Sequence, residues 1–213
     1  SKGTYRHALA ASVVYSFANA GLTQFTTSFF VRTHELSLTQ ANLVFGVGQG
    51  VFAFIGTLVG GFLVDRLQHR APTVAGWVAA GSSAACAFLF AAAFFAPALW
   101  LAVAALMAGK FAQWLAIAPT FSMMQAVAPE RGRATAQAVY LFSVSLIGSG
   151  LGPLTIGALS DAVAAVRIGN LGLTAAQCPA AGSALAGCEA ARATGLQVAM
   201  IVFCLGFLWS ALH

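Results

Sequence analysis

The sequence predicts an all-α integral membrane protein, a polytopic bundle of six transmembrane helices. Of its 213 residues, 60% are hydrophobic and only 7% are charged, whereas soluble domains carry roughly 25% charged residues. The apolar residues are gathered in six blocks, each close to or above the ~20 residues that a helix needs to cross a bilayer. Such blocks must be helical, because an unpaired backbone amide in lipid costs several kcal/mol.

The six predicted spans are joined by short loops, apart from one long external loop. The spans cover about residues 7–31, 38–64, 73–95, 98–126, 132–160 and 192–212, and the long loop covers residues 161–191. Ser37-Leu38-Thr39-Gln40 has the pattern of a capping box at the start of the second span. Because the chain opens at Ser1 without a methionine, we expect residues 1–213 to be one six-helix domain of a longer polypeptide.

The basic residues of the short loops predict the orientation. If the N-terminus is cytoplasmic, the cytoplasmic segments carry Lys2, Arg6, Arg66, Arg70, Arg131 and Arg133. The two short external loops carry only Arg32. The positive-inside rule therefore places both termini in the cytoplasm. The net charge of +5 follows from this topology, and we expect no nucleic-acid partner.

Polar side chains are concentrated in the first, second, fourth and fifth spans, where they recur at helical spacing. We expect these four spans to surround an aqueous path, and the third and sixth spans to face lipid. The candidate substrate-binding residues are Asn19, Thr23, Gln49, Lys110, Gln113, Trp114 and Tyr140. The alternative is that these side chains only join helices, at ~0.6 kcal/mol per hydrogen bond.

Lys110 is the strongest single candidate. It lies twelve residues after Ala98, or ~18 Å along a helix, near the middle of the membrane. A charge at that depth costs at least ~2.5 kcal/mol, so it usually faces a cavity or a partner. We interpret Lys110 as a cation that attracts an anionic group, with Gln113 as a donor and Trp114 packing on the apolar part. The alternative is a structural lysine, bonded to carbonyls or to an acid elsewhere in the polypeptide.

Catalysis, cofactors and metal ions are not expected. The histidines lie at chain ends or in predicted loops (His7, His34, His69 and His213), and no Asp or Glu lies in the core of a span. An enzyme would need a nucleophile with a base, a metal cluster or an acid pair within reach. The sequence therefore argues against a membrane enzyme.

Two cysteines flank nine residues of the long external loop, Cys178 and Cys188. The outer side of the membrane is oxidising in most cells, so this spacing predicts a local disulfide. The alternative is a pair of free thiols. Cys86 and Cys204 lie inside spans, where a thiol usually acts as a small apolar side chain.

Both cytoplasmic loops combine acidic and basic residues. They are Asp65, Arg66 and Arg70 in the first loop and Glu130, Arg131 and Arg133 in the second. Asp65 can accept hydrogen bonds from the N-terminus of a neighbouring helix, and the arginines can pair with acids or carbonyls. We expect a latch that holds one conformation. The alternative is anchoring of the topology, to which Asp65 would not contribute.

Glycines recur at close-packing intervals in two spans. Gly46 with Gly50, and Gly56 with Gly60, form two GxxxG spacings in the second span, and the fifth span carries several glycines before Pro153. Small residues let helices approach closely, and Gly-Pro can provide a kink or pivot. We expect packing, with helix sliding over the same surface as the alternative.

Three of these motifs resemble those of one transporter family. Gly61-x-x-x-Asp65-Arg66-x-x-x-Arg70 resembles the signature loop of the major facilitator superfamily, although members usually have glycine where Gln68 stands. Gly148-x-Gly150-x-Gly152-Pro153 is similar to the second-half copy of the family's glycine-proline motif, and Pro129-Glu130-Arg131-Gly132-Arg133 to the matching cytoplasmic turn. The resemblance covers nearly the whole chain and implies the C-terminal half of a twelve-helix carrier.

Two longer segments resemble bacterial members of the Spinster-like branch. They are Gly21 through Gly61, with His34-Glu35-Leu36-Ser37-Leu38, and Arg133-Ala134-Thr135-Ala136 through Pro153. Eukaryotic relatives of that branch are associated with the export of sphingosine phosphate and lysolipids. The resemblance implies alternating access between two helical halves, in a bacterial inner membrane.

The resemblance also implies the partners: membrane lipid, the N-terminal six-helix half, and a small-molecule or lipid-like substrate. We expect an amphiphilic organic or lipid-like anion. If protons drive transport, their relay must lie in the other half, because a relay needs an acid or histidine inside the membrane. The alternatives are a multidrug or small organic-anion exporter, and a receptor or scaffold that does not transport.

Overall fold

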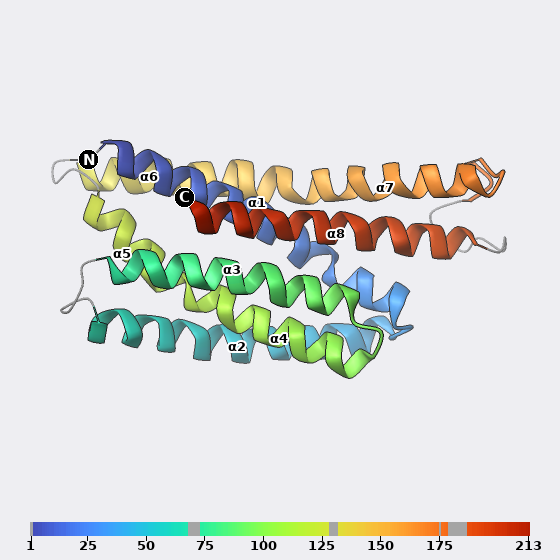
Figure 1. The fold of residues 1–213 in the computed structure, drawn as a ribbon, viewed down its shortest axis with the longest axis horizontal. Helices are drawn as coiled ribbons and strands as arrows, with labels where there is room; N and C mark the ends of the chain where they lie inside the picture. Colours follow the sequence, from blue (N-terminus) through green and yellow to red (C-terminus); the bar gives the residue numbers. More distant parts are fainter. Residues whose placement is uncertain (1, 68–72, 128–131, 175, 179–186) are drawn as a thin grey trace.

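The computed structural model describes residues 2–67, 73–127, 132–174, 176–178 and 187–213, and its regular elements are all helices. They are α1 (Lys2–Thr33), α2 (Leu38–Leu67), α3 (Val74–Phe95), α4 (Leu99–Leu115), α5 (Ile117–Val127), α6 (Arg133–Ser143), the π-helix η2 (Val144–Leu151), α7 (Gly152–Asn170) and α8 (Cys188–Leu212). The long helices run roughly along one axis (Figure 1).

The helices form two groups that α1 joins. In Figure 1, α2, α3 and α4 lie in one group, α6, α7 and α8 lie in the other, and α1 crosses obliquely between them. α1 packs against α8, η2 and α7 on one side and against α2 and α5 on the other. The two ends of the chain lie toward the same end of the bundle. The polar face of α1 is therefore held inside the structure.

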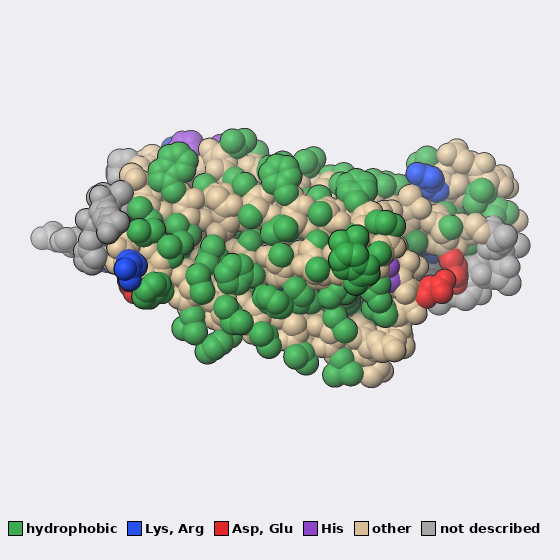
Figure 2. Space-filling model, turned by 60° about the horizontal axis from the view of Figure 1, so that its bottom comes forward, with side chains coloured by type: hydrophobic (Ala, Val, Ile, Leu, Met, Phe, Trp, Pro, Cys, Tyr) green, Lys and Arg blue, Asp and Glu red, His purple; other side chains and the backbone are tan. Residues whose placement is uncertain are grey.

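The described part of the chain has five helical segments that are long and apolar enough to cross a membrane. They are Leu38–Leu67, Val74–Phe95, Leu99–Met124, Arg133–Asn170 and Cys188–Leu212. α1, with 32 residues, is also long enough, but its polar stripe makes it less apolar. Hydrophobic side chains cover the middle of the face in Figure 2, and charged side chains lie toward its two ends. The predicted all-α membrane bundle is confirmed.

The fourth predicted span is not one continuous helix. α4 ends at Leu115 and α5 begins at Ile117, with Pro119 in the first turn of α5. Proline has no N–H to bond the carbonyl of Leu115, but it is well tolerated in a first helical turn. The span predicted over residues 98–126 therefore consists of two helical segments that meet at Ala116, and Leu99–Met124 is still long and apolar enough to cross a membrane.

The fifth span is longer than predicted. α7 continues to Asn170 and α8 begins at Cys188, so the external loop expected over residues 161–191 is confined to residues 171–187. Asp161 and Arg167, which lie within the expected loop, are exposed on α7. The 38 residues of Arg133–Asn170 extend ~57 Å as a helix. Since the hydrocarbon core is only ~30 Å thick, this segment is longer than a span at right angles to the membrane requires.

A π-helix lies where the glycine-proline motif predicted a kink. Pro153 lies two residues after the end of η2, in the first turn of α7, and a proline disrupts the hydrogen-bonding ladder of the preceding helical turn. The Ser16 hydroxyl donates to the Val144 carbonyl over 3.2 Å. A Cβ at Gly152 would lie 2.4 Å from a backbone oxygen of α1. The motif thus both widens the helix and lets it approach α1 closely.

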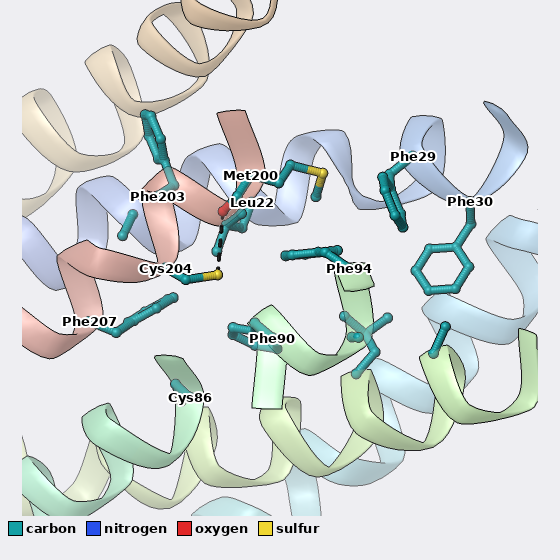
Figure 3. Close-up of a cluster of buried hydrophobic side chains, with 14 of the residues drawn as sticks. Leu22, Phe29, Phe30, Cys86, Phe90, Phe94, Met200, Phe203, Cys204 and Phe207 are labelled. Carbon is teal, nitrogen blue, oxygen red and sulfur yellow. Dashed lines mark hydrogen bonds between the residues drawn. The ribbon is translucent and has the colours of Figure 1, made fainter. Parts of the chain in front are cut away.

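The buried core consists largely of aromatic and sulfur-containing side chains between α1, α3, α4 and α8 (Figure 3). Phe29 meets Phe94 edge-on, with ring centroids 5.1 Å apart. Phe90, Met200 and Phe207 are at most 2% exposed. α3 and α8, which the sequence predicted to face lipid, therefore also supply much of the packing that holds α1.

The predicted capping box is present at the start of α2. The backbone N–H of Gln40 donates to Ser37 Oγ over 3.2 Å. The backbone N–H of Ser37 donates to Gln40 Oε1, also over 3.2 Å. The two side chains thus satisfy backbone donors that the helix itself leaves unpaired.

The two glycine pairs of α2 behave differently. A Cβ at Gly56 would lie 2.7 Å from the Phe111 carbonyl oxygen, and one at Gly60 would lie 2.3 Å from the Leu115 carbonyl oxygen. A Cβ at Gly46 or Gly50 would meet nothing within 4 Å. Only the second pair brings α2 against the backbone of α4.

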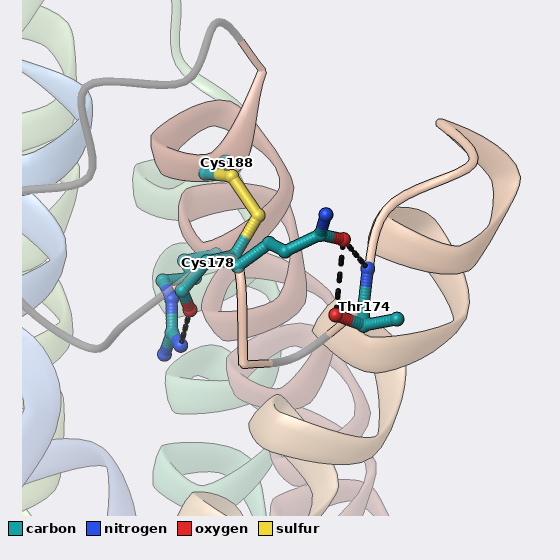
Figure 4. Close-up of a disulfide and its surroundings, with 5 residues drawn as sticks. Thr174, Cys178 and Cys188 are labelled. Carbon is teal, nitrogen blue, oxygen red and sulfur yellow. Dashed lines mark hydrogen bonds between the residues drawn. A yellow bond between two sulfur atoms is a disulfide. The ribbon is translucent and has the colours of Figure 1, made fainter.

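A disulfide joins Cys178 and Cys188, whose Cα atoms are 5.5 Å apart (Figure 4). Both residues are fully buried, in a small cluster with Ile168 and Ala191. The Arg192 guanidinium donates to the Cys178 carbonyl. The disulfide and this hydrogen bond fasten the segment before α8 to the first turns of that helix.

Gly60→Ala should destabilise the protein, because the added methyl meets a backbone oxygen that cannot move aside. We expect a loss of about 1–3 kcal/mol, the usual range for overpacking, measured as a lower thermal denaturation midpoint of the full-length protein in detergent. Gly61→Ala is the matched control, since a Cβ there would meet only Ala118 Cβ, 4.0 Å away. Equal stability of the two variants would contradict the predicted contact.

The disulfide predicts the alkylation pattern of one tryptic peptide, residues 168–192, which contains both cysteines and no internal Lys or Arg. Without reductant, the peptide from denatured protein should take up no alkyl group, and after reduction it should take up two. Mass spectrometry measures both states. Cys188→Ser is the control and should gain one alkyl group without reductant. Alkylation of both cysteines before reduction would show free thiols.

Candidate functional site

Lys110 is buried in the interior of the bundle without an acidic partner. It is only 4% exposed, and its Nζ donates to Thr23 Oγ1 over 3.0 Å. The same nitrogen lies 5.6 Å from the centroid of the Phe90 ring, close enough for a cation–π contact. The acidic residues that the structure describes are all exposed (Glu35, Asp65, Asp161 and Glu189). Among the described residues, the Lys110 ammonium therefore has one hydrogen-bond acceptor, the neutral hydroxyl of Thr23.

A chain of hydrogen bonds continues from Lys110 along α1 and α4. The Thr23 hydroxyl donates to Asn19 Oδ1 over 3.2 Å, and Gln113 Nε2 donates to the same oxygen over 2.5 Å. The Tyr15 hydroxyl donates to the Gln113 backbone carbonyl over 3.2 Å. We call Lys110, Thr23, Asn19 and Gln113 the α1–α4 seam. It holds the polar stripe of α1 against α4.

A cavity of about 370 Å³ lies beside the seam, between α1, α2 and α4; we call it the Lys110 cavity. Its walls include Thr23, Thr26, Thr27, Asn42, Gln49, Lys110 and Trp114, together with apolar residues and glycines. The buried indole nitrogen of Trp114 has no hydrogen-bond partner among the described residues. The volume falls within the ~300–1,000 Å³ of small-molecule sites, which are also mostly apolar with a few polar groups.

A second cavity of about 250 Å³ lies on the other side of the seam, among α1, α3, α5, α6 and α8. Asn19 lines this cavity, and its hydrogen-bond partner Thr23 lines the Lys110 cavity. The seam thus stands between two spaces in the bundle.

Tyr140 lies in the second cavity, away from Lys110. Its ring meets Phe121 edge-on, with the centroids 5.8 Å apart. Tyr140 is seven residues, or ~11 Å, from the start of α6, whereas Lys110 is seventeen residues, or ~26 Å, from the end of α5. The two positions differ in depth, so Tyr140 shares a cavity with Asn19 but not with Lys110.

The remaining expected substrate-binding residues are divided by the structure. Thr23, Gln49, Lys110 and Trp114 line the Lys110 cavity, whereas Gln113 and Asn19 bond each other in the seam. Phe90 beneath Lys110 was not predicted, because α3 seemed purely lipid-facing and its sequence carries no signal of this contact. Thr26 and Thr27 also line the Lys110 cavity and were not among the expected residues.

The expected cytoplasmic latch is described only in part. Asp65, Arg66 and Arg133 are exposed, and the Arg66 guanidinium lies 5.8 Å from the centroid of the Phe62 ring. Arg70, Glu130 and Arg131 lie outside the described residues. The latch therefore stays a prediction.

The seam predicts an energetic coupling between α1 and α4. In a double-mutant cycle, Asn19→Leu and Gln113→Leu should be non-additive by about 0.5–2 kcal/mol, the range of such bonds in membranes. The stability of the full-length protein in detergent measures this. Asn19→Leu with Thr120→Val is the control pair, since the Thr120 hydroxyl bonds within its own helix. Additive effects on stability in both pairs would contradict the predicted coupling between Asn19 and Gln113.

Comparison with known proteins identifies similar membrane transporters. The sequence profile of the Major Facilitator Superfamily matches residues 3–153. An MFS-type efflux pump of Mycolicibacterium smegmatis (strain ATCC 700084 / mc(2)155) is 29% identical over 162 residues, covering 76% of this chain and 38% of that protein.

Two solved structures are also similar, both of a bacterial homolog to the human lysosomal transporter Spinster in an inward-facing conformation. The unoccupied form has a TM-score of 0.85 at 26% identity, covering 99% of this chain and 46% of that one. The occupied form has the same TM-score and identity and covers 98% and 47%. The chain thus spans about half the length of these structures, and with the profile match it belongs to the Major Facilitator Superfamily, with a Spinster-like structure.

Proposed function

We propose that this chain is the C-terminal six-helix half of a secondary active transporter that works by alternating access. Membership of the superfamily supports a transporter and not an enzyme. The match to about half of each Spinster-like structure supports a second helical half as partner. In this class of carriers, substrate sites lie near the bilayer midplane between repeats that rock against each other.

The substrate that we propose is an amphiphilic organic or lipid-like anion. The observation that carries this proposal is Lys110, whose buried ammonium has three donors and a single neutral acceptor, Thr23, among the described residues. A charge in the membrane interior is stabilised by a partner or by a water-filled cavity. An anionic headgroup in the Lys110 cavity would be that partner. Trp114, Phe45 and Met107 supply apolar surface for the rest of the molecule.

A drug or a small organic anion is the second candidate substrate, moved outward. The Mycolicibacterium relative is named an efflux pump, and the mixed polar and apolar walls of the Lys110 cavity suit such molecules as well. A receptor or scaffold on the same fold is the third candidate, and only a flux assay separates it from a carrier.

Orientation and coupling are part of the same proposal. We place both termini in the cytoplasm of a bacterial inner membrane, because the basic residues of the short loops favour that side. Asp65, Arg66 and Arg133, with Arg70, Glu130 and Arg131, would form the cytoplasmic latch. If protons drive transport, the relay belongs to the other half, since the described acidic residues are all exposed.

Flux through the full-length protein in proteoliposomes tests this function. A labelled lysolipid or sphingosine phosphate should cross under an imposed pH gradient, and Lys110→Ala should slow it at least about tenfold. The reason is that truncating one partner of a buried charge pair costs about 2–5 kcal/mol, and 1.4 kcal/mol is a factor of ten. Thr23→Val is the matched control, because it removes the hydroxyl next to Lys110 and keeps the charge.

Each result decides between the candidates. A large loss in Lys110→Ala with a smaller loss in Thr23→Val supports an anion bound by charge. Normal flux in Lys110→Ala would make Lys110 structural. If the wild type moves neither lipid but does move a dye or a small organic anion, the second candidate holds, and if it moves none of these, the carrier proposal fails.

A further inference from the structure

We infer that one face of α2, formed by Gly46, Gly50 and Ala53 and here called the glycine face, sets the width of the Lys110 cavity. It thereby admits anions whose apolar body is broad, such as a fused-ring system, beside the charged group. This inference rests on the proposed function and deepens it, because it names the shape of the substrate as well as its charge.

α2 carries two sets of small and apolar residues in overlapping sectors of the helix. The buried set consists of Ala41, Phe45, Gly56, Gly60 and Val64. The set that lines the Lys110 cavity contains Asn42, Phe45, Gly46, Gln49, Gly50 and Ala53. At about 100° per residue, Gly46 and Gly60 lie only about 40° apart around the helix, and Gly50 and Gly56 about 120° apart. The two GxxxG pairs therefore differ mainly in their position along α2, where the second pair meets the backbone of α4.

The first pair has no packing contact among the described residues. A Cβ at Gly46 or at Gly50 would meet nothing within 4 Å, whereas Gly56 and Gly60 each face a backbone oxygen of α4 at less than 3 Å. Glycine inside a helix is less favourable than alanine, because it has more conformational freedom to lose. Close helix packing explains the glycines at positions 56 and 60 but not those at positions 46 and 50. At the latter two positions, the missing side chain leaves open space in the Lys110 cavity.

The open space faces the groups that we propose to bind the substrate. Lys110, Trp114 and Met107 on α4 line the same cavity as Gly46 and Gly50. A group lying against the glycine face therefore also lies near the Lys110 ammonium and the Trp114 ring. A single alkyl chain would leave much of this width unfilled, while a flat or branched body would fill it. Apolar pockets discriminate through such differences in fit.

The test compares two carboxylates of different breadth, dodecanoate with one straight chain and 1-pyrenebutanoate with a fused-ring body. Binding to the full-length protein in detergent is measured by titration calorimetry for the wild type and Gly50→Val. We expect the affinity for pyrenebutanoate to fall about tenfold or more, as for a pocket that must accommodate extra methyl groups. The affinity for dodecanoate should change less than about twofold, because a single straight chain leaves room for the added methyl groups.

Two control variants separate a filled cavity from a damaged protein. Gly81→Val adds the same side chain to α3 where a Cβ would meet nothing within 4 Å, away from the cavity, and should leave both affinities unchanged. Lys110→Gln should weaken both carboxylates alike. The thermal denaturation midpoint of Gly50→Val should match that of Gly81→Val, because neither added Cβ has a close neighbour.

Three results would overturn the inference. The first is an equal effect of Gly50→Val on both ligands, or none. The second is a much lower denaturation midpoint for Gly50→Val than for Gly81→Val, which would mean that the glycine face packs against the rest of the polypeptide. The third is a wild type that binds neither carboxylate, and this result alone would also count against the proposed function.

Discussion

A charged ammonium in the middle of a membrane must find oxygen atoms to accept its hydrogen bonds, and the organisation of this bundle follows from that constraint. Lys110 lies on α4, and its described acceptor, Thr23, lies on α1. The bond places the polar stripe of α1 inward, between the two helix groups. The bond that Gln113 Nε2 donates to Asn19 Oδ1 and the bond that the Tyr15 hydroxyl donates to the Gln113 carbonyl continue that contact. Interhelical polar contacts of this kind take the place of a hydrophobic driving force in lipid.

The seam separates two groups of polar residues in the described part of the bundle. It lies between the Lys110 cavity and the second cavity, which Tyr140 lines. On one side a cation faces small residues and an aromatic ring, and on the other side neutral hydroxyls face alanines. The close contacts of Gly56 and Gly60 with α4, and of Gly152 with α1, hold the helices that form these walls. An alternating-access cycle must either preserve the seam or exchange its bonds for those of a ligand.

Composition and periodicity were enough to predict the helical bundle, because the membrane requires every long apolar block to be a helix. The capping box at Ser37 was also predictable, since it depends on local side-chain bonds. The break before Pro119 and the long α7 could have been predicted from the missing proline N–H and from counting residues. The partners of Lys110 could not have been predicted. Phe90 contacts it from α3, whose sequence resembles that of a lipid-facing helix and gives no local sign of this contact. The separation of Tyr140 from Lys110 follows from their different depths, which residue type alone does not indicate.

The central claim is that Lys110 recognises the negative charge of a ligand in its cavity. The most direct measurement is the binding of two molecules of equal length, dodecanoate and dodecanol, to the full-length protein and to Lys110→Gln. The wild type should prefer the carboxylate by about tenfold or more, the equivalent of about 1.4 kcal/mol, and this preference should disappear in the variant. A preference for the carboxylate that survives in Lys110→Gln would contradict the account and assign the recognition of charge to another part of the transporter.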